Sequence, residues 1–281
     1  MRRPLLLLLA VLGLVAGSVP ATATPVHDRV RPLAQAHAHN DYEHDRPLFD
    51  ALGEGFTSVE ADIYLVGGDL LVAHDPEDLD PARTLTSLYL EPLRERVIDN
   101  HGGVYRGHRG FQLLIDLKTE GESTYAALDT LLREPRYAFL WTAYRYGHVR
   151  RGAVTAVVSG NRPRATMEAQ RTRVAFYDGR IANESDLGPG SDARLTPLVS
   201  DNWTTLFSWT GAGPMPADEK AELREIVRTA HRAGQRVRFW ATPDVAGPER
   251  DAVWRELVAA DADHINTDDL KGLADFLRSA R

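Results

Sequence analysis

Cysteine is absent from the 281 residues, and apart from the N-terminus there is no long apolar run. Without cysteine the chain can form no disulfide and no thiolate metal site, so the fold depends on its hydrophobic core alone. A transmembrane helix needs about 20 consecutive apolar residues, and no later stretch offers them. A disulfide-stapled scaffold and a membrane-spanning domain are therefore not expected.

The chain also has no surplus of positive charge. The formal net charge is −7 at pH 7, and nucleic-acid binding through phosphate neutralisation needs the opposite sign. We therefore expect no nucleic-acid partner. Lysine is scarce, since only Lys118, Lys220 and Lys271 occur, and the last two lie in segments typical of solvated helix.

The N-terminus has the pattern of an export signal. Arg2 and Arg3 supply a positive start, residues 5–16 an apolar run, and residues 21–23 a small-x-small cleavage site. We expect residues 1–23 to be removed as a secretory signal peptide and residues 24–281 to form one secreted, extracellular domain. An uncleaved anchor is the alternative. The remaining length is near the ~250 residues of a single (β/α)8 barrel.

Strand-like and helix-like segments alternate through residues 24–281, which is typical of βα units in an α/β fold. The predicted strands span residues 33–39, 58–64, 111–117, 154–159, 174–176, 197–200, 237–241 and 264–267. The helices are clearest at residues 216–233, 249–259 and 269–277. Eight strands predict a single (β/α)8 TIM barrel, in a regular, distorted or incomplete form.

Acidic residues gather on the second and third predicted strands. Glu60 and Asp62 share one face of a strand whose other face is apolar, so both should point into the barrel. Asp116 and Lys118 alternate in the same way on the next strand. Inward carboxylates repel one another, and a bound cation is the natural counter-charge. Oxygen ligands favour one divalent cation, Mg²⁺ or Ca²⁺, held by the three carboxylates.

Simpler interpretations exist for each residue taken alone. Glu60 or Asp62 could be the buried partner of an arginine, Asp116 could pair with Lys118, and His74 could be an ordinary loop histidine. Their convergence favours a functional site, because unpaired buried carboxylates are costly and titratable groups cluster where chemistry occurs.

Several motifs resemble one superfamily. His39-Asn40-Asp41-Tyr42 is similar to the His-Asn-Thr-Tyr signature of phosphatidylinositol-specific phospholipase C. Residues 58–75 resemble the acidic pair and the His-Asp of glycerophosphodiester phosphodiesterases, and residues 114–119 resemble a strand of sphingomyelinase-D-type enzymes. All three belong to the phospholipase-C-like phosphodiesterase superfamily. Residues 239–241 and 265–269 also resemble the closing strands of that superfamily. Asn40-Asp41 replaces the Arg-Gly of the glycerophosphodiesterases, which indicates a separate branch.

The resemblance implies a phosphoric diester hydrolase. His39 and His74 would be its acid–base pair, Asn40 would join the carboxylates around the cation, and Lys118 would contact the substrate phosphate. Trp240 is a further candidate for substrate binding, by packing against a glycerol or sugar group.

The implied substrate is a phospholipid or another small phosphodiester such as a glycerophosphodiester. This leaves room for transient contact with a membrane surface and implies no obligate protein partner. The headgroup, the choice of ion, attack by water or by a substrate hydroxyl, and the oligomeric state stay open.

His37 allows two further interpretations. It shares the face of His39 but lies one layer deeper, where a packed, hydrogen-bonded histidine is the default and contact with substrate the alternative. A His-x-His pair is also how amidohydrolase-type barrels hold zinc, although the fifth and sixth strands offer no further histidine. The third class of function is a catalytically silent barrel that binds phospholipid headgroups.

Overall fold

The structure is a computed structural model that describes residues 30–108, 110–182 and 186–279. The expected signal peptide, residues 1–23, lies outside these ranges. No helix in the described ranges has the length and apolar character needed to cross a membrane.

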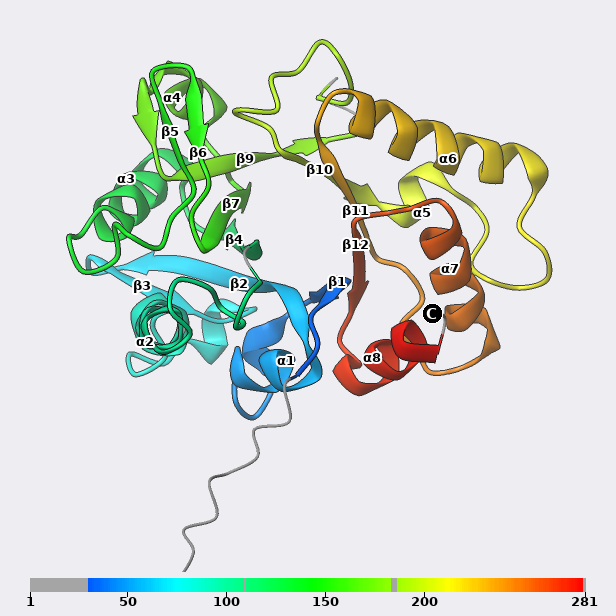
Figure 1. The fold of residues 1–281 in the computed structure, drawn as a ribbon, viewed down its shortest axis with the longest axis horizontal. Helices are drawn as coiled ribbons and strands as arrows, with labels where there is room; N and C mark the ends of the chain where they lie inside the picture. Colours follow the sequence, from blue (N-terminus) through cyan, green and yellow to red (C-terminus); the bar gives the residue numbers. More distant parts are fainter. Residues whose placement is uncertain (1–29, 109, 183–185, 280–281) are drawn as a thin grey trace, which may run out of the picture.

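Eight parallel strands close into a barrel surrounded by helices (Figure 1). In order around the ring they are β1 (Leu33–Ala38), β12 (His264–Thr267), β11 (Arg236–Trp240), β10 (Leu198–Asn202), β9 (Ala175–Arg180), β7 (Val154–Gly160), β4 (Phe111–Leu117) and β2 (Phe56–Val66). Pairing of β1 with β2 closes the ring. The predicted (β/α)8 barrel is confirmed, and each predicted strand overlaps one of the eight.

Short strands also lie outside the ring. They are β3 (Asp69–Val72), antiparallel to β2, and β5 (Ala143–Arg145), β6 (His148–Arg150) and β8 (Thr172–Arg173), which form a small antiparallel sheet. None of the four was predicted, because segments of two to four residues carry little periodicity.

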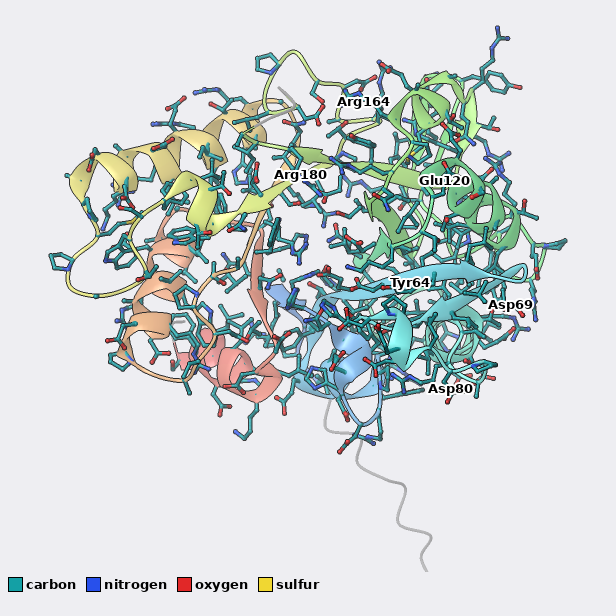
Figure 2. The ribbon with its side chains drawn as sticks, turned by 180° about the vertical axis from the view of Figure 1, so that it is seen from behind. Tyr64, Asp69, Asp80, Glu120, Arg164 and Arg180 are labelled. Carbon is teal, nitrogen blue, oxygen red and sulfur yellow. The ribbon has the colours of Figure 1, made fainter. Side chains whose placement is uncertain are left out.

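Helices cover the outside of the ring, and the view from behind shows the same arrangement with the side chains in place (Figure 2). They are α1 (Phe49–Glu54), α2 (Glu91–Asp99), α3 (Gly121–Leu132), α4 (Arg164–Ala169), α5 (Trp203–Leu206), α6 (Ala217–Arg232), α7 (Pro248–Ala259) and α8 (Leu270–Ser279). Single turns add η1 (Asp41–Glu43), η2 (Pro76–Asp78) and the π-helical η3 (Thr86–Leu90). Between β9 and β10 the described residues form no helix.

The main hydrophobic core lies between the strands and the helices. On β2, Val59, Ala61 and Ile63 are fully buried in this core, as the alternation predicts. The apolar stripe of α6, which includes Leu223 and Val227, is buried as well. Each large apolar side chain buried in this way contributes about 1.5–3 kcal/mol to folding, which a cysteine-free fold requires.

The barrel interior has an apolar half and a polar half. Leu114, Val157, Phe176 and Leu198, from β4, β7, β9 and β10, form a separate buried cluster. Polar side chains from the remaining strands occupy the other half, and His264 on β12 is the least satisfied of them. It is 2% exposed, and neither ring nitrogen has a hydrogen-bond partner among the described residues. Burial, together with nearby positive charge, holds the pKa of His264 well below its ordinary value.

The burial of His264 predicts a pH-dependent stability. Below about pH 6.5 the unfolded chain protonates this histidine while the folded protein does not, so the free energy of unfolding falls as the pH drops. We expect His264→Leu to reduce this slope by up to about 1.4 kcal/mol per pH unit. Urea denaturation between neutral and mildly acidic pH measures the slope, with exposed His148→Leu as the control. An unchanged slope in His264→Leu would contradict the interpretation.

Candidate metal-binding and catalytic site

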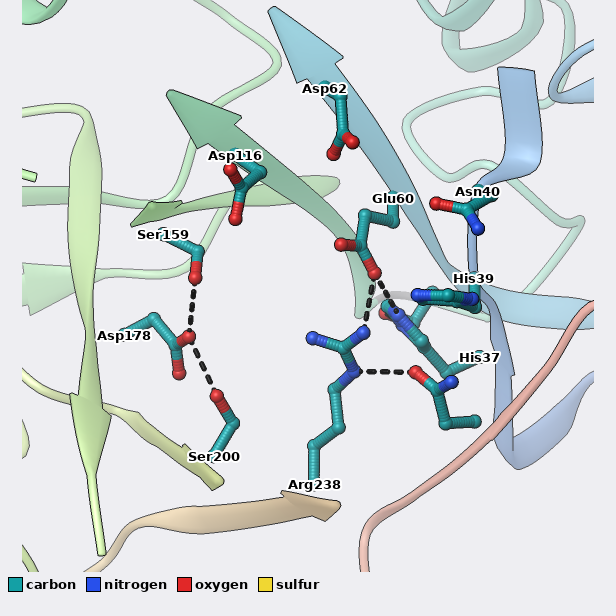
Figure 3. Close-up of polar contacts among 12 residues, drawn as sticks. His37, His39, Asn40, Glu60, Asp62, Asp116, Ser159, Asp178, Ser200 and Arg238 are labelled. Atoms are coloured by element: carbon teal, nitrogen blue, oxygen red, sulfur yellow. Dashed lines mark hydrogen bonds and ion pairs between the residues drawn. The ribbon is translucent and has the colours of Figure 1, made fainter. Parts of the chain in front are cut away.

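Three carboxylates meet at the C-terminal end of the barrel, where barrel enzymes place their active sites (Figure 3). Glu60 and Asp62 project from β2, and Asp116 projects from β4 in direct register with Asp62. One oxygen from each carboxylate lies within 4.8 Å of the other two. The alternation on two adjacent strands therefore brings these predicted residues together.

Glu60 is the most strongly held of the three. Its Oε2 forms an ion pair with Arg238 from β11 and lies 3.3 Å from His37 Nε2. Arg238 Nε in turn donates to Asn266 at 2.8 Å. Burial alone would raise the pKa of Glu60, but Arg238 and His37 outweigh it, so the pKa lies well below its usual range. The arginine partner considered for Glu60 is therefore real, and it keeps the carboxylate ionised.

Asp62 and Asp116 share the ammonium group of Lys118. Its Nζ lies 2.9 Å from Asp62 Oδ2 and 3.3 Å from Asp116 Oδ1. Burial and the charge of Glu60 raise the pKa of Asp62 to about 6 despite this lysine. Burial also raises the pKa of Asp116, although Lys118 opposes the shift.

The set of donors fits a divalent cation on one further observation. Asp62 Oδ1 is buried and has no hydrogen-bond partner in the described part of the chain. A buried carboxylate oxygen is normally satisfied, so this atom is a ligand position available to a cation. The crowded negative charge that raises the pKa of Asp62 would also be relieved there.

His39 is positioned from the neighbouring strand. Its Nδ1 lies 2.9 Å from Asp268 Oδ1, directly after β12, and Asp268 N donates to Asp244 Oδ2 at 2.7 Å. Burial would lower the pKa of His39, but the hydrogen bond to Asp268 and the charge of Glu60 outweigh it and the pKa is raised. When Nδ1 donates to Asp268, Nε2 is left with its lone pair available.

His74 reaches the site through a hairpin. Gly67 and Gly68 have φ of 61° and 101°, a conformation that glycine adopts readily and that a two-residue turn requires. The turn sends β3 back along β2, and Ala73 N donates to Asp62 O at 3.3 Å. His74 consequently lies beside Asp62, with Nδ1 3.4 Å from Asp62 Oδ2 and half of its side chain exposed.

The Tyr42 hydroxyl, for which the sequence predicted no role, connects three of the predicted site residues. Its hydroxyl lies 2.6 Å from Asp62 Oδ2, 2.8 Å from Asn40 Oδ1 and 3.1 Å from His74 Nδ1. Asn40 has a left-handed φ of 45° at the turn after β1. The position of Tyr42 in the His-Asn-Asp-Tyr motif, close to His39, could have predicted that it belongs to the site.

His37 and Trp240, the two remaining predicted residues, differ in solvent exposure. His37 is fully buried and its Nδ1 lies 2.7 Å from Ser58 Oγ, while burial and the nearby Arg238 lower its pKa to about 3. This favours the packed, hydrogen-bonded interpretation over contact with a substrate. Trp240 ends β11 at the same end of the barrel as the carboxylates and is partly exposed.

A second polar cluster faces the carboxylates from β7, β9 and β10 (Figure 3). Asp178 Oδ2 accepts hydrogen bonds from Ser159 at 2.8 Å, Ser200 at 2.7 Å and Arg180 at 2.7 Å. This cluster was not predicted from the sequence. The sequence pattern that could have predicted it is the spacing of two between Asp178 and Arg180 on β9, which places both side chains on one face of the strand. Arg238 and Trp240 have the same spacing on β11.

The zinc alternative lacks its ligands in the described residues. The last residues of β9 and β10 are Arg180 and Asn202, not histidines. The acidic group of Glu60, Asp62 and Asp116 is the one set of three potential ligands found there with suitable spacing, and it contains no histidine.

Comparison with known proteins identifies the class. The AIM6-like phosphodiesterase domain matches residues 24–178, and the glycerophosphoryl diester phosphodiesterase family matches residues 236–271. Together with the barrel, these matches place the chain in the phospholipase-C-like phosphodiesterase superfamily and confirm the resemblance. Within it, the chain belongs to the family of AIM6-like phosphodiesterase domains.

Its relatives include fungal proteins named altered inheritance of mitochondria protein 6. The Eremothecium gossypii protein is 31% identical over 87% of this chain and 69% of its own length. The Kluyveromyces lactis protein is 29% identical, over 87% and 72% respectively. A glycerophosphoryl diester phosphodiesterase from Parabacteroides distasonis has the same fold, with a TM-score of 0.51 at 14% identity over 90% of this chain and 88% of that one.

The surroundings of Gly160 show that the backbone next to Asp116 is tightly packed. Its φ is +66°, and an added Cβ would collide with the Asp116 carboxylate and with the backbone of Leu117. We expect Gly160→Ala to lower the free energy of unfolding by about 1–3 kcal/mol. Gly190→Ala, where the Cβ meets nothing within 4 Å, is the matched control. Denaturant melts of both variants would refute the prediction if they coincide.

Proposed function

We propose that this chain is an exported, divalent-cation-dependent phosphodiesterase that hydrolyses a phospholipid or glycerophosphodiester. The observation that carries the proposal is the meeting of three carboxylates within 4.8 Å, with His74 beside Asp62 and His39 held by Asp268. Membership of a phosphodiesterase-domain family supports the reaction class. Export rests on the N-terminal sequence pattern.

Glu60, Asp62 and Asp116 would hold the cation, with Asn40 as a candidate fourth ligand. When bound, Mg²⁺ or Ca²⁺ would neutralise charge on the non-bridging oxygens of the phosphate. Arg238 supports this role, because it occupies Oε2 of Glu60 and fixes the orientation of the carboxylate. Figure 3 shows the other oxygen on the side of Asp116.

His39 and His74 would carry the protons. One histidine takes the proton from the attacking hydroxyl while the other protonates the leaving oxygen. The contact with Asp268 supports a base role for His39, because a carboxylate on Nδ1 fixes the ring and leaves Nε2 as the acceptor. Lys118 is partly exposed beside Asp62 and Asp116, where its ammonium group could contact a substrate phosphate.

The family and the rim of the site support the proposed substrate class. Trp240 offers an apolar surface for a glycerol or acyl portion, which fits transient contact with a lipid surface. The attacking group is either water or a hydroxyl of the substrate. Product analysis by phosphorus NMR separates the two, because only internal attack gives a cyclic phosphate.

Hydrolysis of bis(4-nitrophenyl) phosphate and of a panel of phospholipids and glycerophosphodiesters tests the reaction. We expect turnover to rise with added Mg²⁺ or Ca²⁺, and kcat/KM to fall about 10²–10⁴-fold in His39→Ala and in His74→Ala. Surface-exposed His148→Ala is the matched control. Full activity in His39→Ala would contradict the mechanism. Zinc-dependent cleavage of an amide would favour the amidohydrolase class, and tight headgroup binding without turnover would favour a silent barrel.

Cation binding can be tested separately from turnover. Isothermal titration with Mg²⁺ and with Ca²⁺ should detect one site, and Asp62→Asn should weaken it by at least about 10-fold, because even outer partners of metal ligands contribute that much. Asp275→Asn removes an exposed acid on α8 and should leave binding unchanged. Equal affinities in the two variants would place the ion elsewhere.

A further inference from the structure

A second cavity, of about 540 Å³, lies at the N-terminal ends of the strands, at the opposite end of the barrel from the carboxylates. Its wall includes the first residues of β4 and β11, early positions of β7 and β9, and the segment around β6. The lining side chains that matter here are Phe111, Val149, Arg151, Thr155, Phe176 and Arg236. A cavity of this size suits a small molecule.

Two arginines in this cavity have no acidic partner. Arg236 Nη2 donates to Gln112 Oε1 at 2.7 Å, and no carboxylate in the described ranges lies within ion-pair distance of Arg236 or Arg151. Burial lowers the pKa of Arg236; Asp263 counteracts the shift and Arg151 adds to it. Arg236 is partly buried, and a guanidinium in that position without an acidic partner would be stabilised by an anion.

The nearest acids are engaged elsewhere. Asp263 Oδ2 binds His231 at 2.9 Å and accepts from Val237 N at 2.9 Å. Asp192 pairs with Arg194, which also borders the cavity, at 2.9 Å. Arg194 is therefore already neutralised, whereas Arg151 and Arg236 line the cavity without an ion pair in the described ranges, and Asp263 acts on Arg236 only from a longer distance.

The cavity also offers hydroxyl donors. Thr142 Oγ1 accepts from Gly152 N at 3.1 Å and lies 2.8 Å from Thr155 Oγ1. When Thr142 donates to Thr155, the proton of the Thr155 hydroxyl can point into the cavity. Two guanidinium groups and a hydroxyl match a ligand with several acceptor oxygens and more than one negative charge.

We infer that this cavity binds a phosphate group, either free or as part of a small organic phosphomonoester, at a site separate from the carboxylate cluster. The aromatic walls Phe111 and Phe176 would accommodate the organic portion. The inference is independent of the proposed hydrolysis, because it needs neither the cation nor the histidines.

The apolar cluster inside the barrel supports the separation of the two sites. Leu114, Val157, Phe176 and Leu198 are fully or almost fully buried. Each lies two positions before a polar residue at the other end, namely Asp116, Ser159, Asp178 and Ser200. Residues two apart share one face of a strand, so on these four strands the cluster lies between the cavity and the catalytic end.

Isothermal titration of the full chain with inorganic phosphate and with phenyl phosphate, in EDTA, tests the inference. We expect saturable binding that weakens about 10-fold or more in Arg151→Gln, since a charge-assisted hydrogen bond commonly contributes a factor of that size. Arg236→Gln should have a similar effect. Arg151 is exposed, so its variant should fold even if Arg236→Gln does not. Tighter binding of phenyl phosphate than of phosphate would identify an organic ligand, and equal binding the free ion.

Two matched variants make the result decisive. Arg150→Gln removes an adjacent exposed arginine that does not line the cavity and should leave the affinity unchanged. Lys118→Ala removes the cation of the catalytic end and should likewise leave it unchanged. Binding that is lost in Lys118→Ala but kept in Arg151→Gln would place the phosphate at the carboxylate cluster and overturn the inference. The absence of saturable binding would overturn it too.

Discussion

Repulsion among Glu60, Asp62 and Asp116 is the constraint around which the catalytic end of this barrel is arranged. Strand alternation and register bring the three carboxylates within 4.8 Å of one another in a region that is largely screened from water. Charges at this distance interact strongly when the effective dielectric constant is low. Arg238 on Glu60 and Lys118 on Asp62 and Asp116 balance part of the charge, and the raised pKa of Asp62 reflects what remains. The divalent cation proposed above would complete the balance.

The two cations have different parts in this balance. Arg238 is buried, bound to Asn266 and placed beneath the carboxylates, so it is a fixed component that orients Glu60. Lys118 is partly exposed and reaches the two aspartates from the rim. An ammonium group on a flexible stem has the freedom to turn from the aspartates toward a bound phosphate, whereas a guanidinium locked in a network does not. Arg238 is thus a structural counter-charge, whereas Lys118 is suited to the substrate contact proposed above.

The residues that sequence could identify were those whose position depends on local periodicity. Alternation along β2 and β4 placed Glu60, Asp62 and Asp116 correctly, and eight predicted strands gave the barrel. The partners that hold them come from distant parts of the chain. Arg238 is 178 residues from Glu60, and Asp268 is 229 residues from His39. Such contacts depend on the register in which the barrel closes, which periodicity does not determine. Tyr42 is an exception, because it lies within the local His39–Tyr42 motif. Its role became clear only from the structure, in which β3 brings His74 next to its hydroxyl.

The two ends of the barrel carry opposite charge although the chain is acidic overall. Acidic groups dominate the C-terminal end, while Arg151 and Arg236 face the cavity at the N-terminal end. The apolar cluster of Leu114, Val157, Phe176 and Leu198 lies between them on one side of the barrel. On the other side, hydrogen bonds run from Arg236 through Gln112, Ser58 and His37 to Glu60. No ion pair in the described residues joins Arg236 or Arg151 to the carboxylates, so the ligands proposed above, a cation at one end and a phosphate at the other, would each offset charge of the opposite sign.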